Sequence, residues 1–266
     1  MVKILALGGA GGMGRYTCRV VAKFKQVEKL TITDMDELVA LQFAGSLESH
    51  ATVLGVALDV TNEDALRAAL RENDVVLNYV GPFFRFGPPV LAAAIAEGCH
   101  YFDIMDDWEP TVKMLGLDEA AKKASVTAVL GLGASPGMTN LLALLAMCEL
   151  DEVNDVYTGW DFGGDSVNDE FSMTIAEHAI EQLTGRVQVR SGGKDQMAKP
   201  LKRLSVHFPG RGHHPVDVFG HPEGISFPHH FPQLQTSLNV VHNLSALDRF
   251  VLRAMLWAVE RGLISK

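Results

Sequence analysis

Short apolar runs alternate with helical patterns through the first half of the chain, beginning with the apolar run Val2–Leu7. This run is long enough for a buried strand and too short for a helix. Further strands are predicted at 30–33, 52–58, 75–80, 101–104 and 127–132, and helices at 15–24, 37–47, 62–70, 90–97 and 118–124. Strands that alternate with helices require crossover connections, so the pattern predicts a doubly wound (Rossmann) α/β fold with a mostly parallel sheet.

The pattern changes near residue 135, where hairpin-like strands replace the regular alternation. Helices are predicted at 138–148, with Ser135 as N-cap, at 170–183, and from Ser245 to about residue 261. Strands are predicted at 153–162 and 237–241, and 186–190 is expected to pair with 204–208. The Gly-, Pro- and His-rich stretch 209–232 is predicted to be mostly loop or edge strand. We expect a dinucleotide-binding domain at 1–135 and a smaller α+β domain for substrate binding and dimerisation at 136–266.

A glycine cluster at 8–14 joins the first predicted strand to the first helix. Within it, Gly9, Gly11 and Gly14 have the spacing G-x-G-x-x-G. In such a turn the first glycine permits the bend, the second lets backbone approach a pyrophosphate, and the third lets the helix pack on the strand. The helix N-terminus adds unpaired N–H groups and the positive end of a dipole. Because strand, turn and helix agree, the cluster predicts a dinucleotide site rather than an ordinary tight turn.

An acidic residue, Asp34, ends the second predicted strand about 20 residues after the last glycine, where a carboxylate binds the adenosine ribose hydroxyls. Met35, Asp36 and Glu37 follow Asp34, and none of them is Arg or Lys, so the 2′-phosphate of NADP would meet further negative charge. The cofactor is therefore expected to be NAD(P), with NAD preferred, and Arg15 is the nearby cation that could reverse the preference. The predicted cofactor-binding residues are Gly9, Gly11, Gly12, Met13, Gly14, Asp34, Asp59, Val60, Asn78, Val80, Gly81 and Pro82.

Composition is that of an ordinary globular protein: 266 residues, 47% hydrophobic and 21% charged. The net charge of −9 argues against nucleic-acid binding, which requires basic patches. Cys18, Cys99 and Cys148 are scattered, so we expect buried thiols in a reducing cytoplasm. The histidines show no zinc-ligand spacing, and no metal is expected. Val2 begins a strand directly and the apolar stretch 141–148 is too short to cross a bilayer, so neither a signal peptide nor membrane association is expected.

Several motifs beyond the glycine cluster resemble the saccharopine dehydrogenase-like family, which includes saccharopine reductases, carboxynorspermidine dehydrogenases, homospermidine synthases and lysine dehydrogenases. They are Gly81-Pro82-Phe83, Gly87-x-Pro89-Val90, Gly98-x-His100-Tyr101-x-Asp103 and the run Gly133–Asn140. The resemblance implies hydride transfer between a nicotinamide and a carbon–nitrogen bond of an amino-acid or polyamine-type substrate. The run after Asp103 departs from the family's Ser/Thr-Gly-Glu, which leaves the substrate open. Family members are usually longer, so we expect a second domain that is short either naturally or by truncation at Lys266.

Proton transfer and substrate binding require groups beyond the carboxyl ends of the strands. Asp106 is the first candidate for moving a proton or holding a substrate ammonium, against the alternative of a solvated loop acid. His178, on the predicted helix 170–183, is the second, against the alternative of a helix-surface histidine. Arg85 could clamp a substrate carboxylate. The helix N-terminus with Ser135, Gly137 and Asn140 is a second candidate carboxylate site.

Two other dehydrogenase classes fail on the residues. A short-chain dehydrogenase needs Tyr-x-x-x-Lys, and none of the four tyrosines has a lysine at that spacing. A semialdehyde dehydrogenase needs an activated cysteine, and neither Cys99, before a strand, nor Cys148, late in a helix, fits. The remaining alternative to an enzyme is a non-catalytic NAD(P)-binding or redox-sensing protein on the same fold. A homodimer through the second domain is expected, since a strand-rich domain leaves a sheet edge to be covered.

Overall fold

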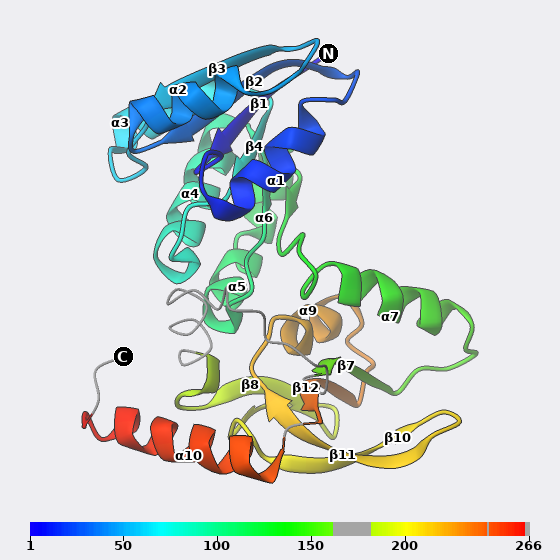
Figure 1. Cartoon of the computed structure of the whole chain (residues 1–266). Helices are drawn as coiled ribbons and strands as arrows, with labels where there is room; N and C mark the ends of the chain where they lie inside the picture. Colours follow the sequence, from blue (N-terminus) through cyan, green and yellow to red (C-terminus); the bar gives the residue numbers. More distant parts are fainter. Residues whose placement is uncertain (162–181, 244, 264–266) are drawn as a thin grey trace. The chain divides into compact units, whose positions relative to one another are not determined.

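The computed structural model describes residues 1–161, 182–243 and 245–263, which fall into two compact units (Figure 1). The first unit comprises Met1–Met105 and Glu109–Gly133. The second comprises Asp106–Trp108 and the chain from Ala134 onward. Among the described helices, none is both long and apolar enough to cross a membrane.

The first unit is built on a parallel sheet with the strand order β3-β2-β1-β4-β5-β6. Its strands are β1 (Val2–Leu7), β2 (Val27–Asp34), β3 (Thr52–Ala57), β4 (Val75–Asn78), β5 (His100–Asp103) and β6 (Ala128–Val129). Its helices are α1 (Gly12–Val21), α2 (Glu37–Gly45), α3 (Glu63–Arg71), α4 (Phe83–Glu97) and α6 (Asp118–Lys123), and α5 (Trp108–Leu115) begins at the unit boundary. The order is that of a Rossmann fold, so the predicted fold class is confirmed.

Strand β1 explains why helices are needed on both faces of this sheet. Leu5 and Leu7 pack into one apolar cluster with residues of α3 and α4, while Ile4 and Ala6 pack into another with residues of α1 and α2. Side chains alternate along a strand, so a continuous apolar run buries both faces only if each face is covered. Local signals set the helix starts: Asp36 Oδ1 accepts from the Leu38 amide at 2.9 Å, and Asn62 Oδ1 accepts from the Ala65 amide at 3.1 Å.

Helix α4 is longer than the sequence predicts. The sequence predicts a strand at 75–80 and a helix at 90–97, whereas α4 begins at Phe83 and carries Pro88 and Pro89 inside it. An interior proline costs roughly 3 kcal/mol through its missing N–H and its steric clash. Burial of Gly87, Val90 and Leu91 in this stretch offsets that cost. Strand β4 is correspondingly shorter than predicted and ends at Asn78, and α5 was not predicted at all.

The second unit is built on a mixed sheet with the strand order β10-β11-β12-β8-β9, to which β7 adds by pairing with β12. Its strands are β7 (Asp155–Asp161), β8 (Val187–Ser191), β9 (Lys194–Ala198), β10 (Arg203–Phe208), β11 (Gly212–Phe219) and β12 (Thr236–His242). Its described helices are α7 (Met138–Cys148), α9 (Glu223–His230) and α10 (Ala246–Glu260). Strand β12 is central, since it pairs in parallel with β7 and antiparallel with β11 and β8.

The hairpin prediction for this unit is wrong. Strand β8 pairs with β9 rather than with β10, and β10 pairs with β11. The turn between β8 and β9 consists of Gly192 and Gly193, both at positive φ, which suits a two-residue hairpin connection. The stretch 209–232 is also more regular than predicted, because it contains β11 and α9. Of the helix predicted at 170–183, residues 170–181 lie outside the described residues.

Two local predictions about the second unit also need correction. Helix α7 has the predicted bounds, but its N-cap is Gly137 rather than Ser135, and the Gly137 amide donates to Asn140 Oδ1 at 2.9 Å. The Ser135 hydroxyl is used elsewhere, as described below. All three cysteines are free, and Cys18 and Cys99 are buried as predicted, but Cys148 at the end of α7 is exposed.

Candidate functional site

The glycine loop of the first unit leaves the start of α1 open. Helix α1 begins at Gly12, and no side chain caps its N-terminus. A Cβ on Gly14 would lie 2.5 Å from the Gly8 carbonyl oxygen, and one on Gly9 would lie 2.8 Å from the Ala6 Cβ, so these two glycines are required for packing. A Cβ on Gly12 would meet nothing within 4 Å. The loop therefore fits a pyrophosphate, because its first-turn N–H groups border open space.

Asp34 lies at the carboxyl end of β2 with one carboxylate oxygen engaged. Its Oδ1 accepts a hydrogen bond from the Asp36 amide at 3.1 Å, while its Oδ2 has no partner among the described residues. The free oxygen is suited to accept from ribose hydroxyls. Asp36 is itself occupied as the N-cap of α2.

Two arginines of α1 contact the same ring of α2. The Arg15 and Arg19 guanidinium carbons lie 4.8 and 5.5 Å from the centroid of the Phe43 ring. Arg15 also donates through Nε to the carbonyl oxygen of Ala10. Cation–π contacts and a backbone hydrogen bond together hold Arg15 in place.

A buried polar chain links the ends of β4 and β5 in the first unit. Asn78 Nδ2 donates to the Tyr101 hydroxyl at 3.0 Å, which donates to Asp103 Oδ2 at 2.8 Å. Asp103 Oδ1 accepts from the amides of Met105 and Gly131. Burial raises the pKa of the Tyr101 hydroxyl well above its ordinary value, and the Asp103 charge adds to the effect. Tyr101 and Asp103 of the resemblance motif thus tie neighbouring strand ends together, with Tyr101 held as a neutral donor.

The predicted cofactor residues after β3 and β4 are also placed by local bonds. The Asp59 carboxylate accepts from the Thr61 hydroxyl and amide, which lowers its pKa. The Val80 amide donates to Asn78 Oδ1 at 3.1 Å, which shapes the turn that leads to Gly81 and Pro82. Arg85, in the first turn of α4, is exposed, and its guanidinium lies 5.1 Å from the centroid of the Phe86 ring. It forms no ion pair with the described residues, so it is free to bind an anion.

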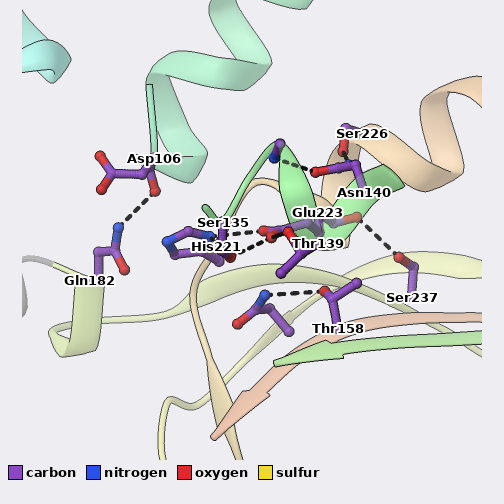
Figure 2. A network of polar contacts seen from close by, with 12 residues as sticks. Asp106, Ser135, Thr139, Asn140, Thr158, Gln182, His221, Glu223, Ser226 and Ser237 are labelled. Carbon is purple, nitrogen blue, oxygen red and sulfur yellow. Dashed lines mark hydrogen bonds and ion pairs between the residues drawn. The ribbon is translucent and has the colours of Figure 1, made fainter. Parts of the chain in front are cut away.

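The second unit contains a buried polar cluster around Glu223, the first residue of α9 (Figure 2). Glu223 Oε1 accepts from the hydroxyls of Ser135 and Thr139, the latter at 2.6 Å. Glu223 Oε2 lies 2.8 Å from Nδ1 of His221. Glu223, His221 and Ser135 are all buried. Three side chains, those of Ser135, Thr139 and His221, thus satisfy both carboxylate oxygens away from water.

Hydrogen bonding keeps Glu223 ionised in spite of its burial. Burial alone would raise the pKa of this carboxyl, but the hydrogen bond and charge of His221 and the hydroxyls of Ser135 and Thr139 hold it below its ordinary value. A carboxylate at this place fixes the imidazole tautomer: the hydrogen of a neutral His221 ring belongs on Nδ1, and Nε2 carries the lone pair.

The cluster is not a hydrolase triad, although it contains a serine, a histidine and a carboxylate. In a nucleophilic triad the serine and the acid contact opposite nitrogens of the ring. Here Ser135 Oγ and Glu223 Oε2 both lie near Nδ1, at 3.1 and 2.8 Å. Ser135 therefore supports the carboxylate and is not activated as a nucleophile.

The sequence-predicted substrate residues meet at this cluster in part. Ser135 belongs to it, and Asn140 lies beside it, accepting from Gly137 and donating through Nδ2 to the Ser226 hydroxyl at 3.3 Å. Asp106 belongs to the same unit, and its main-chain carbonyl accepts from Gln182 Nε2 at 2.7 Å. Figure 2 shows Gln182 pointing towards Asp106. His178 lies outside the described residues.

Sequence reasoning missed Thr139, His221 and Glu223. It assigned His221 to a Gly-, Pro- and His-rich loop, where a histidine is normally solvated. The available signal was the segment His221-Pro222-Glu223, in which a base and an acid lie two residues apart at a helix start. Only the tertiary structure shows that both side chains are buried.

Comparison with known proteins agrees with this geometry. Residues 4–129 match the family model described as the saccharopine dehydrogenase NADP binding domain. These residues make up most of the first unit, so the resemblance to the saccharopine dehydrogenase-like family holds over that domain. The predicted recognition is confirmed, and the first unit is a domain of an NAD(P)-binding oxidoreductase family.

One curated relative and one solved structure extend the comparison. The probable mitochondrial saccharopine dehydrogenase-like oxidoreductase of Arabidopsis thaliana is 31% identical over 121 residues, which are 40% of this chain and 26% of that protein. The apo structure of saccharopine dehydrogenase (L-Glu forming) from Saccharomyces cerevisiae matches 99% of this chain and 59% of its own, with a TM-score of 0.63 and 18% identity. That second likeness shows the fold. The chain spans less than two thirds of either protein.

Proposed function

We propose that the chain is an NAD(P)-dependent dehydrogenase or reductase that moves a hydride to or from a carbon–nitrogen bond of an amino-acid or polyamine-type substrate. The family domain at residues 4–129 carries the proposal. A hydride-transfer enzyme of this kind also needs a group that handles a proton and groups that hold a charged substrate. The polar cluster of the second unit supplies such groups. We propose that the first unit holds the cofactor and the second the substrate.

The residues of the first unit fit a dinucleotide. The first-turn amides of α1 would bind the pyrophosphate, and the free Oδ2 of Asp34 would accept from the adenosine ribose. The segment from Asn78 to Pro82 would border the nicotinamide end. When bound, the nicotinamide accepts or donates the hydride; the protein's own part is to position it and to exclude competing reactions.

NAD is the proposed cofactor in preference to NADP. Asp34, Asp36 and Glu37 place negative charge where the 2′-phosphate would lie. Arg15, the cation that could offset this charge, is engaged by the Ala10 carbonyl and the Phe43 ring. Binding a phosphate through Arg15 would require the guanidinium to give up the carbonyl. The description of the family as NADP-binding makes this preference a specific claim about this chain.

On the substrate side, Asp106 and His178 remain the proposed candidates for proton transfer from the sequence, and Arg85 and the Ser135–Asn140 segment for carboxylate binding. The structure engages Ser135 and Asn140 in hydrogen bonds with neighbouring side chains. Arg85 is the one of these candidates whose charged group is exposed and contacts no acid among the described residues. We therefore propose Arg85 as the residue that attracts the substrate carboxylate.

The test is a turnover screen on the purified full chain. Primary and secondary amino acids and polyamines are incubated with NAD⁺ or NADP⁺, and the absorbance of the reduced nicotinamide is followed; the reverse reaction pairs oxo acids with amines. Oxidation of at least one secondary amine, lost in Gly11→Val, is the expected result. Tight cofactor binding with no turnover across the panel would instead favour a non-catalytic NAD(P)-binding or redox-sensing protein.

A reducing cytoplasm is the proposed compartment, on the basis of three free cysteines. The Arabidopsis relative is named as mitochondrial. The mitochondrial location in the name of that relative does not bear on the chemistry proposed for this chain. Fractionation of cells that express the tagged chain decides the compartment.

A further inference from the structure

Two buried residues of the second unit each have one acceptor atom that bonds to no described residue. His221 is 4% exposed, and its Nδ1 is occupied by Glu223 and Ser135 while its Nε2 bonds to no described residue. Asn239, in the centre of β12, is 1% exposed; its Nδ2 donates to the Thr158 hydroxyl at 3.1 Å, and its Oδ1 has no partner among the described residues. A buried acceptor without a donor costs roughly 1–3 kcal/mol, so Asn239 Oδ1 calls for an explanation.

The sheet register brings the two acceptors to the same region. Asn239 pairs with Phe219 across the antiparallel β11–β12 ladder, so their side chains share one face of the sheet. The His221 ring stacks on Phe219 with their centroids 5.7 Å apart. On the same face, the Ser237 hydroxyl donates to the Glu223 carbonyl at 3.1 Å. Asn239 therefore shares one face of β12 with Ser237, which contacts Glu223, and lies opposite Phe219, whose ring stacks on His221.

Both atoms accept hydrogen bonds when the His221 ring is neutral. In that form Glu223 holds the ring hydrogen on Nδ1, and Nε2 carries the lone pair. This nitrogen is not fully buried, so the small exposure of His221 includes Nε2. Two acceptors beside an ionised carboxylate favour a ligand that presents several N–H groups and a positive charge.

We infer that His221 Nε2 and Asn239 Oδ1 form a substrate ammonium site, in which His221, in place of the sequence candidates Asp106 and His178, is the proton acceptor of the reaction. The inference rests on the proposed function, because it assigns the amine of that substrate to these two atoms. A secondary ammonium presents two N–H groups: one donates to Asn239 Oδ1 and the other to His221 Nε2. The nitrogen then passes one proton to Nε2 and becomes a neutral amine. Its lone pair forms the carbon–nitrogen double bond of an iminium as the hydride passes from the adjacent carbon to an oxidised nicotinamide, the acceptor named in the proposed function.

Glu223 has a positioning role in this step. As Nε2 takes the proton, the imidazole becomes a cation whose other N–H already donates to the Glu223 carboxylate. The Ser135 and Thr139 hydroxyls hold that carboxylate ionised and in place. This arrangement stabilises the charged ring and prevents it from rotating away from the substrate.

The first experiment reads the ring without turnover. Long-range proton–nitrogen NMR of the full chain with ¹⁵N-labelled histidine, assigned by loss of signals in His221→Asn, is expected to show hydrogen on Nδ1 and a bare Nε2. Addition of N-alkyl amino acids should shift the Nε2 signal, whereas dicarboxylic acids of the same length should not. Hydrogen on Nε2, or no response to any amine in the panel, overturns the inference even if the protein proves to be a dehydrogenase.

The second experiment uses the rate of amine oxidation. His221→Asn should lower kcat/KM by about 100-fold or more and remove the limb of the pH profile that requires a deprotonated group. Asn239→Leu should raise KM with little change in that limb, and His229→Asn, an exposed histidine on α9, is the matched control. A pH profile unchanged in His221→Asn overturns the inference. If the wild type oxidises no amine, the proposed function fails and the NMR response to amines alone decides the site.

Discussion

Arg249 forms a bidentate ion pair with Asp217 inside the second unit: its Nε lies 3.0 Å from Oδ1 and its Nη2 lies 2.9 Å from Oδ2. Asp217 belongs to β11 and Arg249 to α10, and both are buried. One helical turn further on, Arg253 Nη2 donates to the Leu201 carbonyl at 2.7 Å. Polar anchors therefore attach α10 to its unit, while its apolar side chains, such as Phe250, are exposed.

Removal of Arg249 should strongly destabilise the second unit. Arg249→Met leaves a buried carboxylate without its partner, and the free energy of unfolding is expected to fall by about 3–5 kcal/mol. Urea denaturation of the full chain, followed by fluorescence and circular dichroism, measures the change. The double variant Asp217→Leu with Arg249→Met should recover most of the loss, because no unpaired charge remains. A loss below about 1 kcal/mol in the single variant, typical of surface pairs, would contradict the prediction.

Gly11→Val should weaken cofactor binding without unfolding the first unit. A Cβ on Gly11 would meet only the Gly8 carbonyl oxygen, at 3.1 Å, so the chain tolerates a side chain better here than at Gly14. The added methyl groups would occupy the approach to the start of α1, where the pyrophosphate is expected. Calorimetric titration should show affinity reduced at least tenfold. Gly45→Ala, at the end of α2 with open space around it, is the control. Unchanged affinity in Gly11→Val would remove the predicted cofactor site.

Asp34 is expected to set the preference for NAD. Dissociation constants measured at one salt concentration should favour NAD over NADP, because Asp34 and its acidic neighbours repel a 2′-phosphate. Asp34→Asn should bring the two dissociation constants closer together, because it weakens the binding of NAD and strengthens the binding of NADP. Tighter NADP binding by the wild type would contradict the prediction and would indicate that Arg15 leaves Phe43 to bind the phosphate. Arg15→Ala would then restore the preference for NAD.

Most of the first unit could be predicted because its signals are local. The apolar run of β1, the glycine spacing and the caps Asp36 and Asn62 each act within a few residues. The main error, α4, arose where a local signal was outweighed: Pro88 and Pro89 disfavour a helix interior, but burial of the surrounding positions imposes one. A local preference fails as a predictor where the free energy gained by tertiary burial exceeds the few kcal/mol that the preference is worth.

The second unit and its polar cluster depended on contacts that sequence pattern does not encode. Strand β12 pairs with β7, about 80 residues earlier, at register Asn239 to Thr158. Whether β8 pairs with β9 or with β10 depends on which partner the rest of the sheet leaves free. Glu223 and His221 lie in a stretch without hydrophobic periodicity, so their burial becomes visible only once β12 and α7 surround them. Asn140 was predicted, with Ser135 and Gly137, as part of a carboxylate site at the start of a helix, and it lies beside the cluster with its Oδ1 accepting from the Gly137 amide.

The lowered pKa of Glu223 makes stability depend on pH in the acid range. The carboxyl is held below its ordinary value of 4.5 in the folded chain, so its contribution is complete above that value and is lost as pH falls through the folded pKa. The groups that face it are His221, Ser135 and Thr139. Urea denaturation at pH 7, 5 and 4 should show a smaller fall in unfolding free energy for Glu223→Gln than for wild type. Glu109→Gln, an exposed acid paired with Lys113, is the control. An equal fall in Glu223→Gln would contradict the role of Glu223.

A homodimer through the second unit is the remaining expectation from the sequence. Helix α7 has no buried residue, and Leu142 and Leu145 are 59% and 67% exposed. Exposure of two leucines on one helix is unfavourable in water, and a symmetric dimer would bury both of them in each copy. Light scattering coupled to size exclusion should give twice the mass of one chain for wild type and the mass of one chain for Leu142→Glu with Leu145→Glu. Leu41→Glu, an exposed leucine on α2 of the first unit, should leave the dimer intact. A wild-type protein that is monomeric at all working concentrations would contradict the prediction, and the exposed face of α7 would then need another partner.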